Sequence, residues 1–148
     1  AFQQLVGKFK AEAKYKPDAN TPEQTSTGEA TNTLILGGRF LKTEYAGDMM
    51  GQPFKGIQLF GYDNGTKKYQ SVWIDEMSTS MMVSEGASAD EGKTINLACT
   101  FYCPITQGER KSKMTFTIKS ADEHTFEMYD TADGKETKMM SIVYTRMK

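Results

Sequence analysis

The dominant pattern along the chain is an alternation of apolar and polar residues at every second position. The first clear example is KFKAEAKYK at residues 8–16, whose apolar face carries Phe9, Ala11, Ala13 and Tyr15. Successive side chains of a β-strand point to opposite faces, so this stretch predicts a half-buried strand. The same alternation recurs and predicts ten strands, at residues 8–16, 24–35, 38–47, 54–62, 68–76, 79–86, 93–103, 113–119, 124–130 and 136–147.

Turn-forming residues separate these segments, as at Asn64-Gly65, Asp90-Glu91-Gly92 and Asp133-Gly134. The short spacing between segments favours antiparallel neighbours, and closing such a meander removes its exposed edges. The pattern therefore predicts one all-β domain over residues 1–148. It is a closed antiparallel up-and-down β-barrel of about ten strands, with at most a short N-terminal helical turn at residues 2–6.

The hairpin around Asn64-Gly65 indicates which face of the sheet turns inward. Parity across this hairpin places nine residues on one face: Phe54, Gly56, Gln58, Phe60, Tyr62, Tyr69, Ser71, Trp73 and Asp75. Aromatic rings mixed with a glycine and a few polar groups are typical of a cavity lining, so we expect this face to point inward. The opposite, outward face carries aliphatic residues, among them Ile57, Leu59, Val72 and Ile74.

Charge and length exclude several classes of partner. The 148 residues include 18 Lys and Arg against 19 Asp and Glu, a formal net charge of -1. Because no net positive field is present, we expect no nucleic-acid partner. No apolar run approaches the roughly 20 residues that cross a bilayer. We expect a soluble protein of the cytoplasm or periplasm, a monomer or weak homodimer, without a membrane span.

The cysteines and the single histidine argue against a metal or a disulfide. Cys99 and Cys103 lie four residues apart on an expected strand, which separates their Cα atoms by about 13 Å. A disulfide needs less than about 7 Å. Structural zinc usually needs four protein ligands, and the chain has two cysteines and one histidine. We therefore expect free thiols, no metal site and no cofactor.

Four segments carry a resemblance to a known family: LVGKF, LGGRFLKTEYAG, GYDNGTKKYQSVWIDEMST and IVYTRMK. They resemble a bacterial family of calycin-like domains of unknown function, related in fold to lipocalins, fatty-acid-binding proteins and nitrobindins. The resemblance covers essentially the whole chain and is most specific at residues 61–79. It implies a closed barrel with an internal cavity and no established activity. Phe9 departs from the tryptophan that is usual in this family.

These observations predict a binding protein that holds a small, partly apolar and in some cases anionic ligand inside the barrel. Arg39 shares the parity of Tyr45, and Arg146 follows Tyr144, so either guanidinium can pair with an anionic group. The other interpretation leaves both arginines at the rim, in water or paired with a carboxylate of the protein. The expected ligand-binding residues are Arg39, Tyr45, Phe60, Trp73, Asp75, Met114, Phe116 and Arg146.

Two other functions remain open, and neither has an assigned catalytic residue. Asp75, next to Trp73, is a candidate acid or base for an enzyme, or else a hydrogen-bonding bracket that holds the barrel together. Its neighbour Glu76 points to the other face, which disfavours a two-carboxylate glycosidase. A third possibility is an interaction barrel that uses the outer aliphatic face around Ile57.

Three motifs suggest chemistry that their context disfavours. Residues 87–94 (ASADEGKT) match a loose phosphate-binding loop, but a strand pattern follows Thr94 where a helix is needed, so we expect a hairpin with Gly92 at positive φ. His124 follows two acidic residues, which indicates a solvated strand end rather than a haem ligand. The methionine doublets suggest copper(I), but a strand splits each doublet between faces, so we expect core and cavity filling: Met49-Met50, Met81-Met82 and Met139-Met140.

Overall fold

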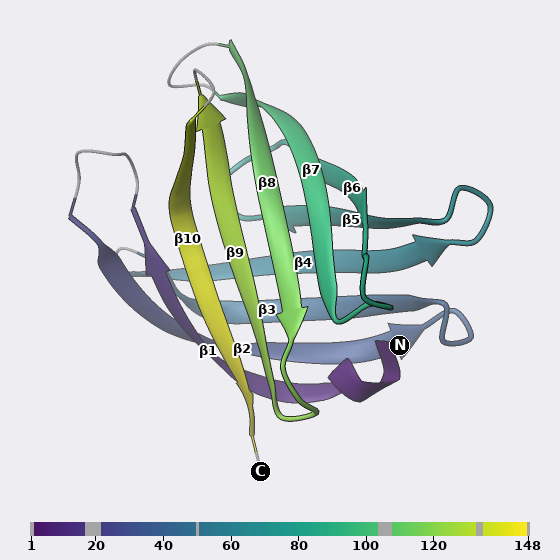
Figure 1. Ribbon diagram of the computed structural model, residues 1–148. Helices are drawn as coiled ribbons and strands as arrows, with labels where there is room; N and C mark the ends of the chain where they lie inside the picture. The colour runs from purple at the N-terminus through teal and green to yellow at the C-terminus, as the bar shows by residue number, and fades with distance from the viewer. Residues whose placement is uncertain (1, 17–21, 50, 104–107, 133–134, 148) are drawn as a thin grey trace.

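The computed structural model describes residues 2–16, 22–49, 51–103, 108–132 and 135–147. They form a closed barrel in which each strand pairs antiparallel with its sequence neighbours and β1 pairs with β10 (Figure 1). A 3-10 helix, η1 (Phe2–Leu5), precedes the strands. The strands are β1 (Gly7–Tyr15), β2 (Gln24–Ile35), β3 (Phe40–Met49), β4 (Gln52–Asp63), β5 (Lys68–Asp75), β6 (Met82–Ala87), β7 (Thr94–Cys103), β8 (Gly108–Ile118), β9 (Glu123–Ala132) and β10 (Lys135–Arg146).

This architecture confirms the predicted fold, although some strand boundaries differ. β3 begins at Phe40 rather than residue 38, because Leu36, Gly37 and Gly38 adopt positive φ in the preceding turn. β8 begins five residues before the predicted 113, at Gly108. Its first residues are polar on both faces, so alternation of hydrophobicity gave no signal there. No helix in the described part of the chain is long and apolar enough to cross a membrane.

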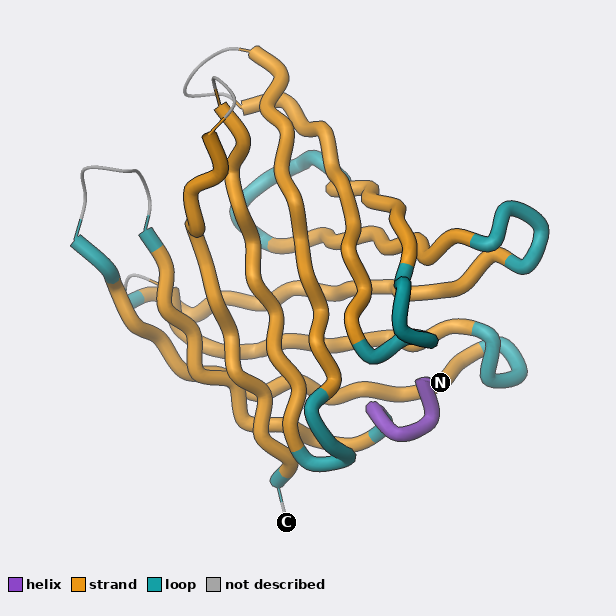
Figure 2. The backbone as a smooth tube through the Cα atoms, in the orientation of Figure 1, coloured by secondary structure: helices purple, strands orange, loops and turns teal. Residues whose placement is uncertain are grey.

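Burial agrees with the predicted inward face along most of β4, but not at Tyr62 near its end, which is 41% exposed. Phe54, Gly56 and Phe60 are buried, whereas Leu59 and Ile74 on the other face are 41% and 39% exposed. Strands β7–β10 form one wall of the barrel and run at a steep angle to strands β2–β5, which form the opposite wall (Figure 2).

The barrel has two ends. The η1 end carries η1 and the turns at 36–39, 64–67, 88–93 and 119–122, and the opposite end carries the strand ends at Tyr15, Gln24, Asp75 and Met82.

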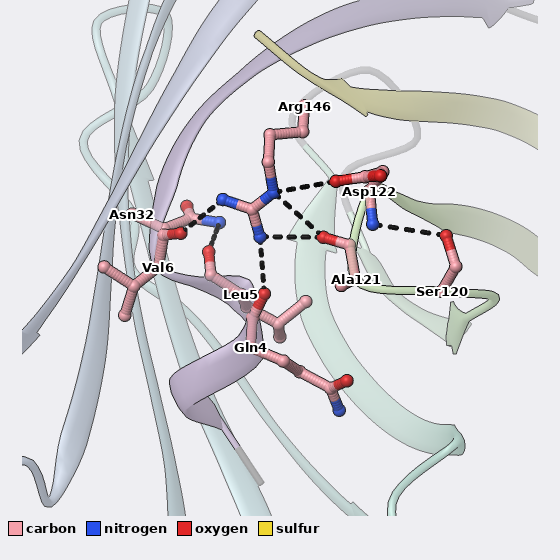
Figure 3. A network of polar contacts seen from close by, with 8 residues as sticks. All are labelled: Gln4, Leu5, Val6, Asn32, Ser120, Ala121, Asp122 and Arg146. Atoms are coloured by element: carbon pink, nitrogen blue, oxygen red, sulfur yellow. Dashed lines mark hydrogen bonds and ion pairs between the residues drawn. The ribbon is translucent and has the colours of Figure 1, made fainter. Parts of the chain in front are cut away.

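Arg146 holds the η1 end together (Figure 3). Its Nη1 donates to the carbonyl of Val6 at 2.7 Å, and its Nη2 donates to the carbonyls of Gln4 and Ala121, each at 2.7 Å. Its Nε lies 3.3 Å from a carboxylate oxygen of Asp122. One side chain of β10 therefore ties the segment around η1 to the turn between β8 and β9. The predicted ligand role of Arg146 needs correction, since its donors already bind backbone carbonyls.

Below Arg146, aromatic rings form a column that reaches into the barrel. The guanidinium carbon of Arg146 lies 4.6 Å from the ring centre of Phe9, which is fully buried. Phe9 contacts His124 edge to face at 4.7 Å, and His124 stacks on Tyr144 at 4.6 Å with ring planes 13° apart. The ring of Phe9 therefore lies between the guanidinium of Arg146 and the imidazole of His124.

The expectation that His124 is a solvated strand end is wrong. The side chain is 8% exposed, because β9 begins at Glu123 and places His124 on its inward face. Its Nδ1 atom is buried and has no hydrogen-bond partner among the described residues. Burial lowers the pKa of His124 from 6.5 to about 4, and the positive charge of Arg146 adds to this effect.

Replacing Arg146 by methionine should lower the free energy of unfolding by about 3 kcal/mol, because several charge-assisted hydrogen bonds to carbonyls are lost together. Urea titration followed by far-UV circular dichroism measures the change. Arg39→Met is the matched control, since Arg39 is exposed in a turn, and it should change stability by less than about 0.5 kcal/mol. Equal effects of the two substitutions would contradict the anchoring role of Arg146.

His124 should make the barrel sensitive to mild acid. The unfolded histidine takes up a proton near pH 6.5, whereas the folded one stays neutral until about pH 4. The unfolded state therefore binds more protons in this window, so the free energy of unfolding should fall by about 3 kcal/mol as pH drops through it. Urea titrations between pH 7 and pH 5 should show a shallower slope against pH for His124→Phe than for the unaltered protein. Identical slopes would rule out the buried histidine as the cause.

Candidate functional site

The best candidate site is an internal cavity of about 220 Å³ in the half of the barrel away from η1. Aromatic and methionine side chains make up most of its wall. It includes five of the residues predicted to bind a ligand: Tyr45, Trp73, Asp75, Met114 and Phe116. The other described residues of the wall are Ala13, Tyr15, Ser26, Asp48, Phe54, Gln58, Ser71, Met82, Phe126, Met128, Met140, Ile142 and Tyr144.

An aromatic wall extends over β3, β4 and β5. Trp73 stacks on Phe54 with ring planes 27° apart and centres 6.4 Å apart, and Tyr45 contacts Phe54 edge to face at 6.1 Å. Gly56 lies beneath the indole, where a Cβ atom would overlap the Trp73 ring. The glycine therefore lets Trp73 lie flat across β4. Gly28 makes the same space for the ring of Tyr45.

Asp75 fixes the orientation of Trp73. One carboxylate oxygen accepts a hydrogen bond from the indole Nε1 at 2.6 Å, and the other accepts one from the backbone N–H of Met77 at 2.9 Å. Asp75 thus joins the end of β5 to the aromatic wall. This geometry supports the interpretation of Asp75 as a bracket, while its carboxylate still lines the cavity.

Two buried tyrosine hydroxyls, of Tyr45 and Tyr144, and a second carboxylate, of Asp48, are among the other polar groups of the cavity. Burial raises the pKa of Tyr45, and the nearby charge of Asp48 raises it further. Burial also raises the pKa of Tyr144. Both phenols therefore stay protonated at neutral pH and present a hydroxyl that can donate or accept.

Three methionines lie opposite the aromatic wall of β3, β4 and β5. Met114, Met128 and Met140 are consecutive cross-strand partners on β8, β9 and β10, and Met82 adds a fourth thioether from β6. Of the doublet at 81–82, Met82 lines the cavity at the start of β6, while Met81 precedes that strand and is 65% exposed. Methionine side chains are flexible and polarisable, so this wall can adapt to different ligand shapes.

A second chamber of about 40 Å³ lies under η1, and this is where Phe60 is found. Gln58, Phe116 and Tyr144 line both chambers and so separate them. A space of this size holds about one water molecule. Phe60 is packed edge to face against Phe2 of η1 at 5.3 Å. It therefore contributes to the closure of the η1 end rather than to the wall of the larger cavity.

The expectation that Arg39 faces inward is wrong. Arg39 is exposed in the turn at 36–39, before β3 begins, and lies at the η1 end of the barrel. The alternation of inward and outward side chains that holds for Leu41 and Tyr45 does not extend back to Arg39, because the turn residues are not in the extended conformation. Neither of the two predicted arginines therefore belongs to the described wall of the 220 Å³ cavity.

The segment at residues 87–94 is a hairpin connection followed by a strand, as predicted. β7 begins at Thr94, and Gly92 has a φ of 92°. The Ser88 hydroxyl accepts hydrogen bonds from the N–H groups of Gly92 and Asp90, and the Asp90 carboxylate accepts one from the N–H of Thr94. These backbone N–H groups therefore donate to side chains of the turn itself. In a phosphate-binding loop they would be free to donate to the phosphate.

The thiol and carboxylate groups offer little for metal binding. Cys99 is a free, buried thiol whose pKa is raised by burial, and the Cys103 side chain lies outside the described residues. Within the described ranges, no group of three or more His, Cys, Asp or Glu side chains is placed to hold a metal ion. The chemistry available in the cavity is therefore that of aromatic rings, thioethers, hydroxyls, the Gln58 amide and two carboxylates.

Comparison with known proteins gives one family and several similar folds. The family described as "Protein of unknown function (DUF1579)" matches residues 1–146. A search among curated proteins finds no match.

Among solved structures, the crystal structure of Rv2717c from M. tuberculosis is similar, with a TM-score of 0.72 and 16% identity over 99% of this chain and 95% of that chain. The S-type phycobiliprotein lyase CPES from Guillardia theta has a TM-score of 0.66 and 11% identity over 99% and 90% of the two chains. A redesigned beta barrel has a TM-score of 0.53 and 15% identity over 100% and 96%. These similarities establish the fold.

Gly56→Ala should displace the indole of Trp73, because the added methyl group occupies the space of the ring. Trp73 is the only tryptophan, so its fluorescence maximum and its accessibility to acrylamide report the change directly. We expect a red shift and stronger quenching. Gly65→Ala, in the exposed turn between β4 and β5, should leave both unchanged. An unaltered spectrum in a folded Gly56→Ala protein would show that the indole does not lie against Gly56.

Proposed function

The chain belongs to the DUF1579 family of unknown function, and we propose that it is a binding protein that holds a small, mostly apolar molecule in the 220 Å³ cavity. The observation that carries this proposal is the composition of the wall, in which aromatic rings face a row of methionines. Ligand sites are typically concave and mostly apolar, with a few placed polar groups. Tyr45, Asp75 and Tyr144 are such groups.

The volume limits the size of the ligand. An engineered cavity of roughly 150 Å³ holds benzene, whereas sites for drug-sized ligands span about 300–1,000 Å³. A space of about 220 Å³ therefore suits a molecule with one or two rings. Adaptable methionines allow some variation in shape, so we expect selectivity for size and charge more than for one exact outline.

An enzyme that uses Asp75 is the alternative, and the phycobiliprotein lyase of similar fold is a reason to test it. The described geometry favours binding, since each oxygen of Asp75 already accepts a hydrogen bond. His124 lies in the smaller chamber, beyond Gln58, Phe116 and Tyr144. An acid and a base that act on one substrate must both reach it. Gln58, Phe116 and Tyr144 separate Asp75 from His124.

Filling the cavity should weaken ligand binding without unfolding the barrel. Isothermal titration of 2-naphthol, a two-ring probe, into the unaltered protein should give saturable binding that also quenches Trp73. Ala13→Leu adds three carbon atoms to the cavity wall and should weaken binding at least roughly tenfold, by occupying the space that the ligand needs.

Ala46→Leu is the matched control, because Ala46 is exposed on the outer face of β3; its affinity should equal that of the unaltered protein. Equal binding by both variants would place the ligand elsewhere. Loss of a catalytic activity in Asp75→Asn, with 2-naphthol binding retained, would instead favour the enzyme.

A further inference from the structure

We propose that the natural ligand of the cavity is a cation, namely an organic ammonium ion with one or two rings, recognised by Asp48, Asp75 and the aromatic wall. This inference rests on the proposed function and specifies the charge of the ligand. It differs in sign from the anionic ligand that the sequence suggested, and it depends on where the charged side chains lie.

The charge of the cavity favours a cation. Two carboxylates, Asp48 and Asp75, are among the described residues of its wall, which include no lysine, arginine or histidine. Arg110, on the same face of β8 as Met114, forms an ion pair with Asp130. An anion would therefore enter a space without a free counter-charge, whereas a cation would meet the Asp75 carboxylate and, at the rim, the exposed Asp48 carboxylate.

The aromatic lining of the cavity also favours a cation. The faces of electron-rich rings attract cations, tryptophan most strongly, and sites for quaternary ammonium ions are typically cages of such rings. Trp73 and Phe54 stack to form one side of the cavity, and Tyr45 and Tyr144 contribute two further rings. The hydrogen bond from Trp73 Nε1 to Asp75 places a negative charge in the plane of the indole, which makes the ring face more electron-rich.

The strand register brings the aromatic and acidic groups together. Tyr45, Gly56 and Asp75 are cross-strand partners in one row on β3, β4 and β5. Because Gly56 has no side chain, the row has a gap between the phenol and the carboxylate, and the Trp73 ring lies over it. A carboxylate has about four acceptor positions, of which Asp75 uses two, so it can still accept from an ammonium group or stabilise a quaternary one.

These contacts also predict how the ligand lies. Asp48 is exposed near the end of β3, and Asp75 is half-buried at the end of β5. The ammonium group belongs at this end, where water still reaches it and the cost of desolvation is small. The ring of the ligand belongs deeper, between Phe116 and the row of methionines.

Three probes with the same phenylmethyl body and equal numbers of non-hydrogen atoms test the inference: benzyltrimethylammonium, the uncharged neopentylbenzene and the anionic benzylsulfonate. Isothermal titration at low salt should show that the cation binds roughly tenfold tighter than the uncharged probe. Benzylsulfonate should bind weakest.

In the double variant Asp48→Asn and Asp75→Asn, the cation and the uncharged probe should bind within about threefold of each other. The uncharged probe should bind as in the unaltered protein, because asparagine keeps the shape and an acceptor for Trp73. The double variant Glu44→Gln and Glu76→Gln changes the net charge equally at exposed positions of the same region, and it should keep the preference for the cation.

The outcomes separate the two proposals. Binding of the uncharged probe without preference for the cation would overturn the cationic ligand and leave the binding function standing. Tightest binding of benzylsulfonate, or a preference that survives removal of both carboxylates, would also overturn it. Failure of all three probes to bind would refute the binding function itself. If the Asp75→Asn change unfolds the barrel, Asp48→Asn alone should still lower the preference at least roughly twofold, and an unchanged preference would count against the inference.

Discussion

The pairing of β1 with β10 is the constraint on which the rest of the structure depends. Seven residue pairs, from Phe9 with Arg146 to Tyr15 with Met140, close the sheet and remove its edges. Once this register is set, parity determines which residues point inward on both strands. The same register brings Arg146 over Phe9, so the interaction that closes the η1 end follows from the one that closes the sheet.

Closure divides the interior into two regions with different roles. At the η1 end, Arg146, Phe9 and His124 pack into a column in which Arg146 donates to backbone carbonyls and the rings pack on one another. At the opposite end, the aromatic rings and methionines surround 220 Å³ of space, with carboxylates as the charged groups. Stability is concentrated at one end and ligand binding is proposed for the other, so substitutions in the two regions are expected to affect different properties.

Much of the site follows from strand parity, which the sequence displays. Tyr45, Trp73, Asp75, Met114 and Phe116 were all expected inside, and all line the cavity. Parity gives the face of a strand but not the height along the barrel. For this reason Phe60 and Arg146 point to the correct side and yet lie in the half of the barrel near η1. Arg39 fails for a different reason, because parity does not extend into a turn.

Sequence alone determined the class of the fold, the number of strands and the inward face, because alternation at period two and turn residues are local properties of the chain. It also determined that residues 87–94 connect two strands. Only the tertiary structure decided that His124 is buried, that Met114, Met128 and Met140 stand in one row, and that the charged groups of the cavity are carboxylates. These properties depend on contacts between strands far apart in sequence and on their stagger around the barrel. No local pattern records that stagger, so the sign of the charge in the cavity became visible only when the barrel was closed.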